Sequence, residues 1–356
     1  MAIDLHDLLK EMVEKGASDL HLGAGAVPHL RIHERLVALE KKELDANSSK
    51  DLIYSILTNE QKARFERERE LDFAFTREGL GRFRVNVFWQ RGYVGSAIRA
   101  LPFKIMSFEE CGLPVKLLEG FCNKPKGLIL VTGATGSGKS TTLASMVDWV
   151  NTRKDRHIIT VEDPIEYVHS NKKSIIDQRE IGSDTQSFPN ALKHVLREDP
   201  DVILIGEMRD LETVESALII AETGHLVFAT LHTSDSVQTI NRIIDVFPAR
   251  QQPQVRAQLS FVLMGVLSQQ LIPMVSGDGR VLAVEVLVAN HAIRTQIRES
   301  KVHQMYSALQ TGQKDGMQTM NQSLFSLFLN GKISKEDALG RTTELQDLER
   351  LFKEKR

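Results

Sequence analysis

The sequence predicts an α/β fold, in which a mostly parallel sheet is covered by helices and is preceded by a smaller α+β domain. Two features predict it. From about residue 113, apolar runs alternate with helix-like stretches, and a glycine-rich loop follows the first of these runs. The four runs read GLILVTG, HIITVED, DVILIGE and HLVFATLH. Runs that are apolar at nearly every position are typical of parallel strands buried on both faces, with helical crossovers between them.

The chain as a whole has the composition of a globular protein with more than one domain. It has 356 residues, of which 42% are hydrophobic and 26% charged, and this length exceeds one ordinary core. The formal net charge of −2 is too small for binding nucleic acid by charge alone, so we expect no such partner. With only two cysteines and no long apolar stretch, we expect a cytoplasmic protein that is not inserted in a membrane.

Residues 1–100 are expected to form the α+β domain. An amphipathic helix opens it and stops at Gly16; its apolar residues are Leu5, Leu8, Leu9, Met12 and Val13. The segments DLHL, PHLRIH and RLVALE read as short strands, and DLIYSILTNEQKARFERE reads as helix. In LGRFRVNVFWQRGYVGSAIRAL, alternation from Phe83 to Trp89 predicts a half-buried strand that presents arginine on its other face.

The remaining chain divides into three predicted parts. Residues 101–112 read as a linker, in which Ser107 and Glu110 have the spacing of a capping box. Residues 113–289 hold the alternating strands and helices of the core. In residues 290–356 the strand pattern stops, and segments such as AIRTQIRES and TMNQSLFSLFLNG predict a helical C-terminal region.

The glycine-rich loop, GATGSGKST, has the full spacing of a Walker A motif between a strand and a helix. Its residues are Gly133, Ala134, Thr135, Gly136, Ser137, Gly138, Lys139, Ser140 and Thr141. Backbone amides and the start of the helix would hold phosphate groups, and Lys139 would bridge the β and γ phosphates. The hydroxyl of Ser140 would ligate Mg²⁺, so the loop predicts ATP and Mg²⁺ as cofactors.

Two acidic segments end neighbouring predicted strands. In VEDPIEY, Glu162 and Asp163 follow a buried strand, where one of them could orient an attacking water or both could be a solvated turn. In ILIGEMRD, Gly206 stands where P-loop enzymes commonly place an aspartate, and Glu207 follows it. A glutamate at this place would reach the metal through its longer side chain, through water.

Two histidines flank the strand in TGHLVFATLHT. His232 lies at the far end of the strand and is the better candidate for sensing the γ-phosphate, whereas His225 can equally be a satisfied strand-end residue. No cysteine or histidine partner lies at zinc spacing, so a zinc site is not expected.

The chain resembles the secretion-superfamily ATPases, which drive type II and type IV secretion and assemble or retract type IV pili. The resemblance is carried by four segments in this order: Walker A, VEDPIEY, GEMRD and TGHLVFATLHT. The resemblance is closest to the pilus retraction branch and extends over nearly the whole chain. It rests on GASDLHL, GRFRVNVF, LHTSDSVQTINRIIDVFP, QLSFVLMGVLSQQLIP and GMQTMNQSLF. The absence of a four-cysteine zinc motif also favours the retraction branch over the assembly branch.

The resemblance implies a RecA-like P-loop core, a PAS-like N-terminal domain, and roles for matching residues. Glu162 matches the catalytic glutamate, and Glu207 matches the Walker B glutamate near the metal. His225 and His232 match the His box. Two arginines of the N-terminal domain, Arg84 and Arg99, match those that approach the nucleotide, although they could instead only solvate a sheet face.

Two departures from the retraction branch stand out. The family signature AIRNLIRE reads AIRTQIRE at residues 292–299, with Gln296 in place of leucine. In the Walker A loop, Ala134 replaces the usual proline, as in an accessory paralogue of the retraction ATPases.

The family implies a homohexameric ring in which the N-terminal domain closes Arg84 and Arg99 onto ATP. This ring would act on an inner-membrane platform protein, be peripheral to that membrane, and so remove pilin from the pilus base during twitching. The alternatives are an accessory retraction ATPase, a nucleotide-dependent ring with negligible hydrolysis, and a RecA-like nucleic-acid translocase. The last is disfavoured by the charge and by 6% aromatic residues, and the paired glutamates disfavour the ring without hydrolysis.

Overall fold

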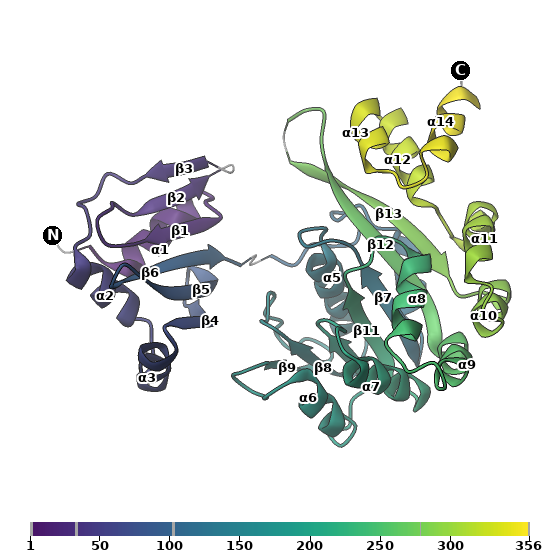
Figure 1. Cartoon of the computed structure of the whole chain (residues 1–356), viewed down its shortest axis with the longest axis horizontal. Helices are drawn as coiled ribbons and strands as arrows, with labels where there is room; N and C mark the ends of the chain where they lie inside the picture. The colour runs from purple at the N-terminus through teal and green to yellow at the C-terminus, as the bar shows by residue number, and fades with distance from the viewer. Residues whose placement is uncertain (1–2, 33–34, 102–103, 278, 355–356) are drawn as a thin grey trace. The chain divides into compact units, whose positions relative to one another are not determined.

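The computed structural model describes residues 3–32, 35–101, 104–277 and 279–354. The chain divides into two compact units, Met1–Lys104 and Ile105–Arg356 (Figure 1). This division falls inside the segment predicted to be a linker. The boundaries of the four predicted parts stay a prediction.

The first unit is a six-stranded antiparallel sheet with helices packed against one of its faces. The strands follow the order β3-β2-β1-β6-β5-β4. Their bounds are β1 Asp19–Leu22, β2 His29–Ile32, β3 Arg35–Ala38, β4 Glu70–Arg77, β5 Gly81–Gln90 and β6 Tyr93–Ala100. The helices are α1 Leu5–Glu14, α2 Ala46–Tyr54 and α3 Asn59–Glu68. Alternate residues of the strands, such as Phe83, Val85 and Val87, form one core with these helices.

Two local predictions for this unit are wrong in detail. The single helix predicted around residues 51–68 is two helices, because Thr58 forms a capping box with Gln61 and starts α3 anew. The single strand predicted after residue 80 is a hairpin of β5 and β6. Its turn lies at Arg91 and Gly92, which both have positive φ, 49° and 82°, as a type I′ hairpin turn requires.

The second unit contains a seven-stranded sheet in the order β13-β12-β7-β11-β10-β8-β9. The strands are β7 Gly127–Thr132, β8 His157–Glu162, β9 Ile175–Glu180, β10 Val202–Ile205, β11 Leu226–Leu231, β12 Leu263–Pro273 and β13 Arg280–Val288. The four apolar runs are β7, β8, β10 and β11, and they pair in parallel as predicted. β9 and β12 extend the sheet in parallel, and β13 is antiparallel to β12.

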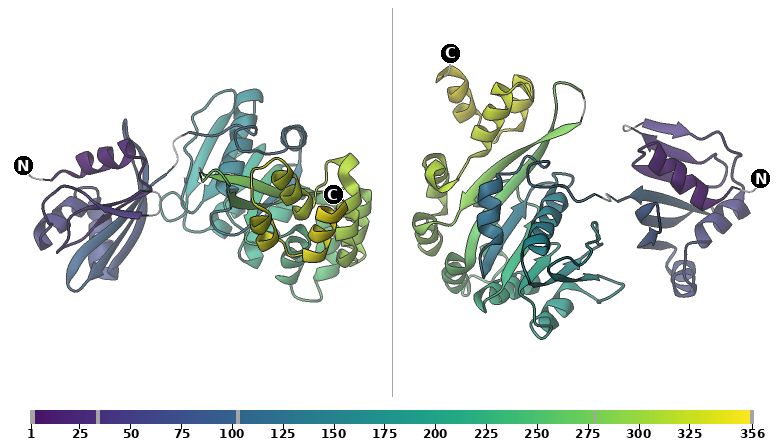
Figure 2. Two further views of the ribbon diagram at one scale, coloured as in Figure 1. Left: turned by 90° about the horizontal axis from the view of Figure 1, so that it is seen from above. Right: turned by 180° about the vertical axis from the view of Figure 1, so that it is seen from behind.

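Helices cover both faces of this sheet (Figure 2). They are α4 Val115–Cys122, α5 Lys139–Arg153, α6 Phe188–Val195, α7 Leu211–Glu222, α8 Ser236–Asp245 and α9 Gln252–Val262. The strands supply alternate residues to two cores: Ile129 and Val131 pack with α4 and α5, and Leu128 and Leu130 pack with the helices of the other face. The carboxyl ends of β7, β8, β10 and β11 therefore meet at one edge of the sheet.

The C-terminal region is helical, as predicted, and packs partly on β13. It consists of α10 His291–Arg298, η1 Val302–Gln304, α11 Met305–Thr311, η2 Gly312–Asp315, α12 Met320–Leu329, α13 Lys335–Arg341 and α14 Leu345–Glu354. Leu324 and Phe325 of α12 form a separate small core with Ile272 and Ala283 of the β12–β13 pair. The sheet thus connects this region to the strands beside the glycine-rich loop.

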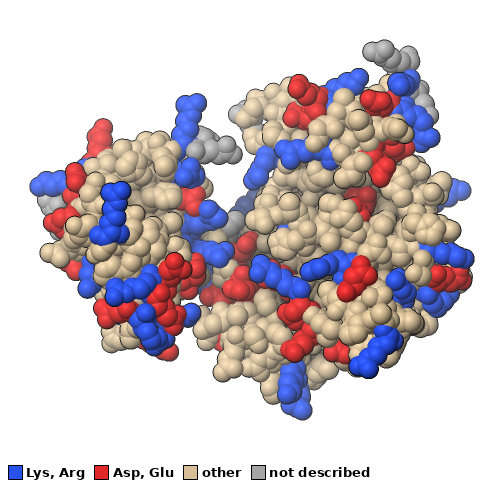
Figure 3. Space-filling model, in the orientation of Figure 1, with Lys and Arg blue, Asp and Glu red and all other residues tan. Residues whose placement is uncertain are grey.

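The surface carries both signs of charge. Lysine and arginine alternate with acidic residues over the face shown in Figure 3, in keeping with the small net charge. Within the described part of the chain, no helix combines the length and apolarity needed to span a bilayer.

Candidate functional site

The glycine-rich loop joins the end of β7 to the start of α5, and its backbone needs glycine at three places. Gly133, Gly136 and Gly138 have φ of 141°, 79° and 90°, a region that other residues rarely adopt. Gly133 also lies in a tight space. A Cβ there would be 2.5 Å from the carbonyl oxygen of Gln269 and 2.6 Å from Oγ of Ser137. The sequence therefore folds here into a loop that leads directly into a helix N-terminus, the usual geometry of a phosphate cradle.

Lys139, the first residue of α5, is only 9% exposed. Its Nζ donates to the carbonyl oxygens of Gly133 at 2.8 Å and Ala134 at 3.1 Å, so the amine lies over the loop. Burial lowers the pKa of Lys139, and the nearby carboxylates of Glu166 and Glu207 oppose this shift. A phosphate oxygen could replace either carbonyl as acceptor, so the loop and the amine suit a nucleotide's phosphates.

Residues outside the motif hold the first turn of α5, directly after the loop, from both sides. Oγ1 of Thr141 lies 2.9 Å from Oη of Tyr167. On the other side, Nε2 of Gln269 in β12 donates to Oγ1 of Thr142 at 2.7 Å. Tyr167 and Gln269 were not predicted as site residues, because nothing in either local sequence indicates which distant segment the side chain contacts.

Glu162 is the last residue of β8 and is partly buried, whereas Asp163 beside it is exposed. The Glu162 carboxylate accepts from Oγ1 of Thr160 at 2.6 Å and from Nε2 of Gln178 at 3.3 Å. Burial raises the pKa of Glu162 to about 7, against the opposing effect of these two donors. Glu162 therefore exchanges a proton near neutral pH, which suits an acceptor for a proton from water.

Glu207 and His232 lie together at the ends of β10 and β11. The Glu207 carboxylate is 2.7 Å from Nε of Arg209 and 3.6 Å from Nε2 of His232. Gly206 explains the departure noted in the sequence. A Cβ at Gly206 would be 3.2 Å from Cα of Glu162, so glycine allows the close approach of β8 and β10 without displacing either strand.

His225 lies outside this cluster, and its role at the nucleotide site stays a prediction. It lies at the amino end of β11, where its carbonyl pairs with the N–H of Gly127 at the start of β7. The glycine-rich loop follows the opposite ends of these parallel strands, about six residues or ~20 Å away. Nδ1 of His225 lies 3.1 Å from the carbonyl oxygen of Ile220, at the end of α7. The strand-end reading therefore fits this histidine.

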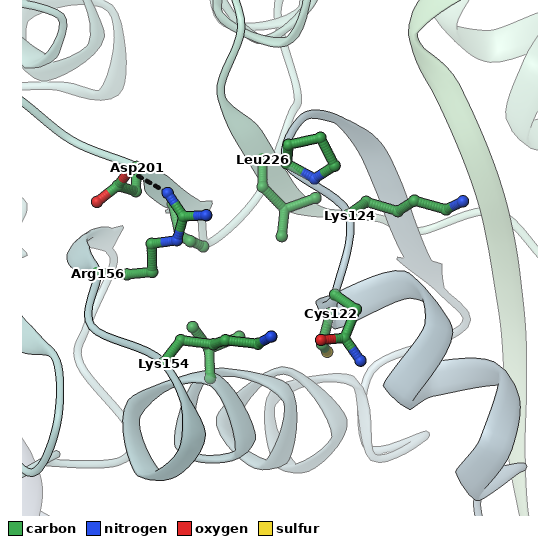
Figure 4. Close-up of a pocket in the computed structure, with 10 residues that line it drawn as sticks. Cys122, Lys124, Lys154, Arg156, Asp201 and Leu226 are labelled. Atoms are coloured by element: carbon green, nitrogen blue, oxygen red, sulfur yellow. Dashed lines mark hydrogen bonds and ion pairs between the residues drawn. The ribbon is translucent and has the colours of Figure 1, made fainter.

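A small cavity lies at the same amino-terminal edge of the sheet. It measures about 30 Å³ and is lined by Lys124, Lys154 and Leu226, among others. Figure 4 shows the ion pair between Arg156 and Asp201 at its side, with an N–O distance of 2.7 Å. This volume holds about one water molecule, so the cavity is not a nucleotide site.

Arg84 and Arg99 belong to the first unit, where they are direct neighbours on β5 and β6. Arg84 is exposed. Nε of Arg99 donates to Asp19 at 2.8 Å, although its side chain stays 65% exposed. Both arginines therefore present charge on the helix-free face of the sheet, and their approach to a nucleotide stays a prediction.

The described residues contain no group of three or more histidine, cysteine or carboxylate side chains that could hold a metal ion. Mg²⁺ is usually bound by one or two protein oxygens together with phosphate and water. Ser140, at the start of α5, and Glu207 offer such oxygens.

A Walker A loop at the carboxyl edge of a parallel sheet, with acidic residues ending the neighbouring strands, defines a P-loop nucleotide-binding protein of the RecA-like type. Within this class, the chain belongs to the family described as type II/IV secretion system protein, whose profile matches residues 1–339.

The relatives agree with the predicted branch. The chain is 48% identical to a type IV pilus retraction ATPase, PilT, of Pseudomonas aeruginosa, over 94% of this chain and 97% of that protein. It is 46% identical to a twitching motility protein of Neisseria gonorrhoeae, over 91% and 87%. It is 40% identical to the type IV pilus ATPase PilU of Pseudomonas aeruginosa, over 99% and 92%.

Solved structures give the same result for the fold. The pilus retraction motor PilT with bound ADP matches with a TM-score of 0.93 and 52% identity, over 98% of this chain and 99% of that one. The ATPase DotB of Legionella pneumophila matches with a TM-score of 0.79 and 28% identity, over 94% of both chains. The predicted fold class and the resemblance to retraction ATPases are confirmed.

Proposed function

We propose that this chain is an ATP-hydrolysing motor that powers type IV pilus retraction. The observation that carries the proposal is the meeting of three elements at one edge of the sheet: the loop with Lys139, the Glu162 carboxylate, and the Glu207–His232 pair. Similarity over nearly the full length to proteins named as retraction ATPases supports the same function.

In this proposal the loop amides and Lys139 bind the phosphates of ATP. Ser140 would hold Mg²⁺, with Glu207 acting through a water molecule, and the metal would supply positive charge against the phosphate oxygens. Glu162 orients the attacking water and accepts its proton, which a carboxylate with a pKa of about 7 can do near neutral pH. His232 contacts the γ-phosphate from the side of Glu207.

The active assembly is a homohexamer in which the first unit supplies Arg84 and Arg99 to a nucleotide. An arginine delivered to the transferring phosphoryl group increases the rate of hydrolysis by ~10³–10⁵-fold. Closing and opening of the ring moves an inner-membrane platform protein, to which the motor binds from the cytoplasm. Pilin is removed from the pilus base as a result.

Substitution of Lys139 tests the proposal. Lys139→Ala is expected to abolish ATP-dependent phosphate release in the full chain, because it removes the amine that donates to the loop carbonyls of Gly133 and Ala134. Lys172→Ala is the control, since the Lys172 amine pairs with Asp148 at 2.6 Å and away from the loop. The assignment of the nucleotide site would be refuted if Lys139→Ala still hydrolysed ATP. It would also be refuted if Lys172→Ala lost hydrolysis while Lys139→Ala kept it.

Two further measurements separate the alternatives. Phosphate release is expected without DNA or RNA, whereas a nucleic-acid translocase would need one of them. In a strain without the gene, the wild-type chain is expected to restore twitching and reduce pilus number. An accessory retraction ATPase, to which Ala134 and the 40% identity to PilU point, would restore neither without a second motor.

A further inference from the structure

The strand pair β12–β13 carries buried polar residues to which the sequence motifs assign no role. Glu285 of β13 lies opposite Ser268 of β12, and Ser268 lies opposite Thr132 of β7. Glu285 is 4% exposed, and the other two are fully buried. Oγ1 of Thr132 lies 2.9 Å from Oγ of Ser268. Because Thr132 directly precedes the glycine-rich loop, this row leads from the loop to the edge of the sheet.

Glu285 fixes a second loop at the end of this row. Its Oε1 accepts from the backbone N–H of Ser236 at 2.8 Å and from the Ser236 hydroxyl at 2.7 Å. Ser236 is the first residue of α8 and directly follows the loop that carries His232. A buried carboxylate is costly unless it is hydrogen-bonded, and here two donors of the same residue satisfy one oxygen.

The loop from His232 to Ser236 is short and is held at both ends. Its first residue follows β11 and lies 3.6 Å from Glu207. Within it, Oγ1 of Thr233 lies 2.7 Å from Oγ1 of Thr239. Only three residues separate His232 from Ser236, so a displacement of Ser236 is expected to shift His232 as well.

The glycine-rich loop is held separately. Nε2 of Gln269 binds Thr142 on the opposite face of the sheet, at 2.7 Å, and does not involve Ser236. The contacts of Lys139 with its own loop involve neither Glu285 nor Ser236, so a change at Glu285 is expected to act mainly on the His232 loop.

Building on the proposed ATPase function, we propose that Glu285 is a positioning residue for hydrolysis. It is not among the residues proposed to bind nucleotide or Mg²⁺; it keeps the loop of His232 at the distance from Glu207 that the reaction requires. Misplacement of a catalytic group by about 1 Å can cost ~10²-fold in rate. Loss of the hydrogen bonds between Glu285 and Ser236 is thus expected to lower kcat and to leave nucleotide affinity unchanged.

Three variants of the full chain test this. Glu285→Leu removes both acceptor contacts and is expected to lower kcat by ~10–100-fold, with the Kd of fluorescent ADP within about threefold of wild type. Glu285→Gln keeps an acceptor oxygen for Ser236 and is expected to retain kcat within about threefold. Ser236→Ala removes only the hydroxyl donor, so it is expected to lower kcat by less than Glu285→Leu does. It tests the same contact if Glu285→Leu fails to fold.

Ser323→Ala is the matched structural control. Oγ of Ser323 accepts from the N–H of Val284 at 3.0 Å, so this variant weakens the same strand without touching the His232 loop. It is expected to lower Tm and keep kcat. The proposal is overturned if Ser236→Ala and Glu285→Leu keep the wild-type kcat, if Ser323→Ala loses as much kcat as Glu285→Leu, or if ADP affinity falls in parallel with kcat. Absence of hydrolysis in the wild type would instead refute the proposed function.

Discussion

Gln296, which stands in place of a leucine in the AIRTQIRE segment, is expected to cost stability. Its Oε1 is buried and accepts no hydrogen bond, while the flanking Ile293 and Ile297 are fully buried. A buried acceptor without a partner costs about 1–3 kcal/mol. Leucine has a similar volume and no polar atom, so Gln296→Leu is expected to stabilise the second unit by about 1–2 kcal/mol.

Calorimetry of the full chain measures this effect. For a unit of this size, 1 kcal/mol corresponds to about 2–4 °C, so Gln296→Leu is expected to raise the Tm of the second unit by about 2–8 °C. Gln296→Glu, which would bury a charge, is expected to lower it. Scans at one fixed rate keep the comparison valid for a chain with two units.

A second glutamine gives the matched control. Nε2 of Gln310 donates to Oδ1 of Asp347 at 3.0 Å, so Gln310→Leu removes a satisfied hydrogen bond and is expected to lower Tm. If Gln296→Leu lowered Tm as much as Gln310→Leu does, the reasoning from the unpaired oxygen would be wrong.

Two further predictions concern the nucleotide loop and its neighbour. If Glu162 is the proton acceptor, kcat rises with pH through about 7, its pKa, and Glu162→Gln abolishes this limb; a rising limb retained by the variant would contradict the role. Because this folded-state pKa lies above the ordinary 4.5, ionising Glu162 costs the wild type stability as pH rises from about 4.5 to 7. The Tm of Glu162→Gln is thus expected to exceed the Tm of the wild type by more at pH 8 than at pH 5. Gly133→Ala places a methyl group 2.5 Å from the Gln269 carbonyl, so lower Tm and weaker ADP binding are expected. Gly120→Ala, with open space in α4, is the control and should keep both.

The sequence predicts the central strands and the loop well because their signals are local. Apolar runs such as 128–131 and the spacing from Gly133 to Ser140 are visible in a few adjacent residues. The position of Glu207 and His232 at one edge follows from parallel pairing, so their proximity could also be predicted from the sequence.

Other features depend on contacts between distant segments, and the sequence gives no comparable signal for them. β12 was not predicted, because QLSFVLMGVLSQQLIP contains both the end of a helix and a strand. Its antiparallel partner β13, Arg280–Val288, was not predicted either. The contacts of Glu285 with Ser236 join residues 49 positions apart. His225 shows the reverse case: the motif groups it with His232, but a six-residue strand separates the two.

Arg294 has a consequence for where the chain can be divided. Its guanidinium donates to the carbonyl oxygens of Ala289, Ser260, Phe261 and Leu263 at 2.6–2.8 Å. These carbonyls belong to the last turn of α9, the first residue of β12 and the residue after β13. A truncation at residue 289 would remove the cation that neutralises this helix end and leave its carbonyls without a donor. The shortest stable catalytic fragment should therefore include Arg294 and the whole of α10, which ends at Arg298. A hinge that lets the later C-terminal helices move must lie beyond Arg298.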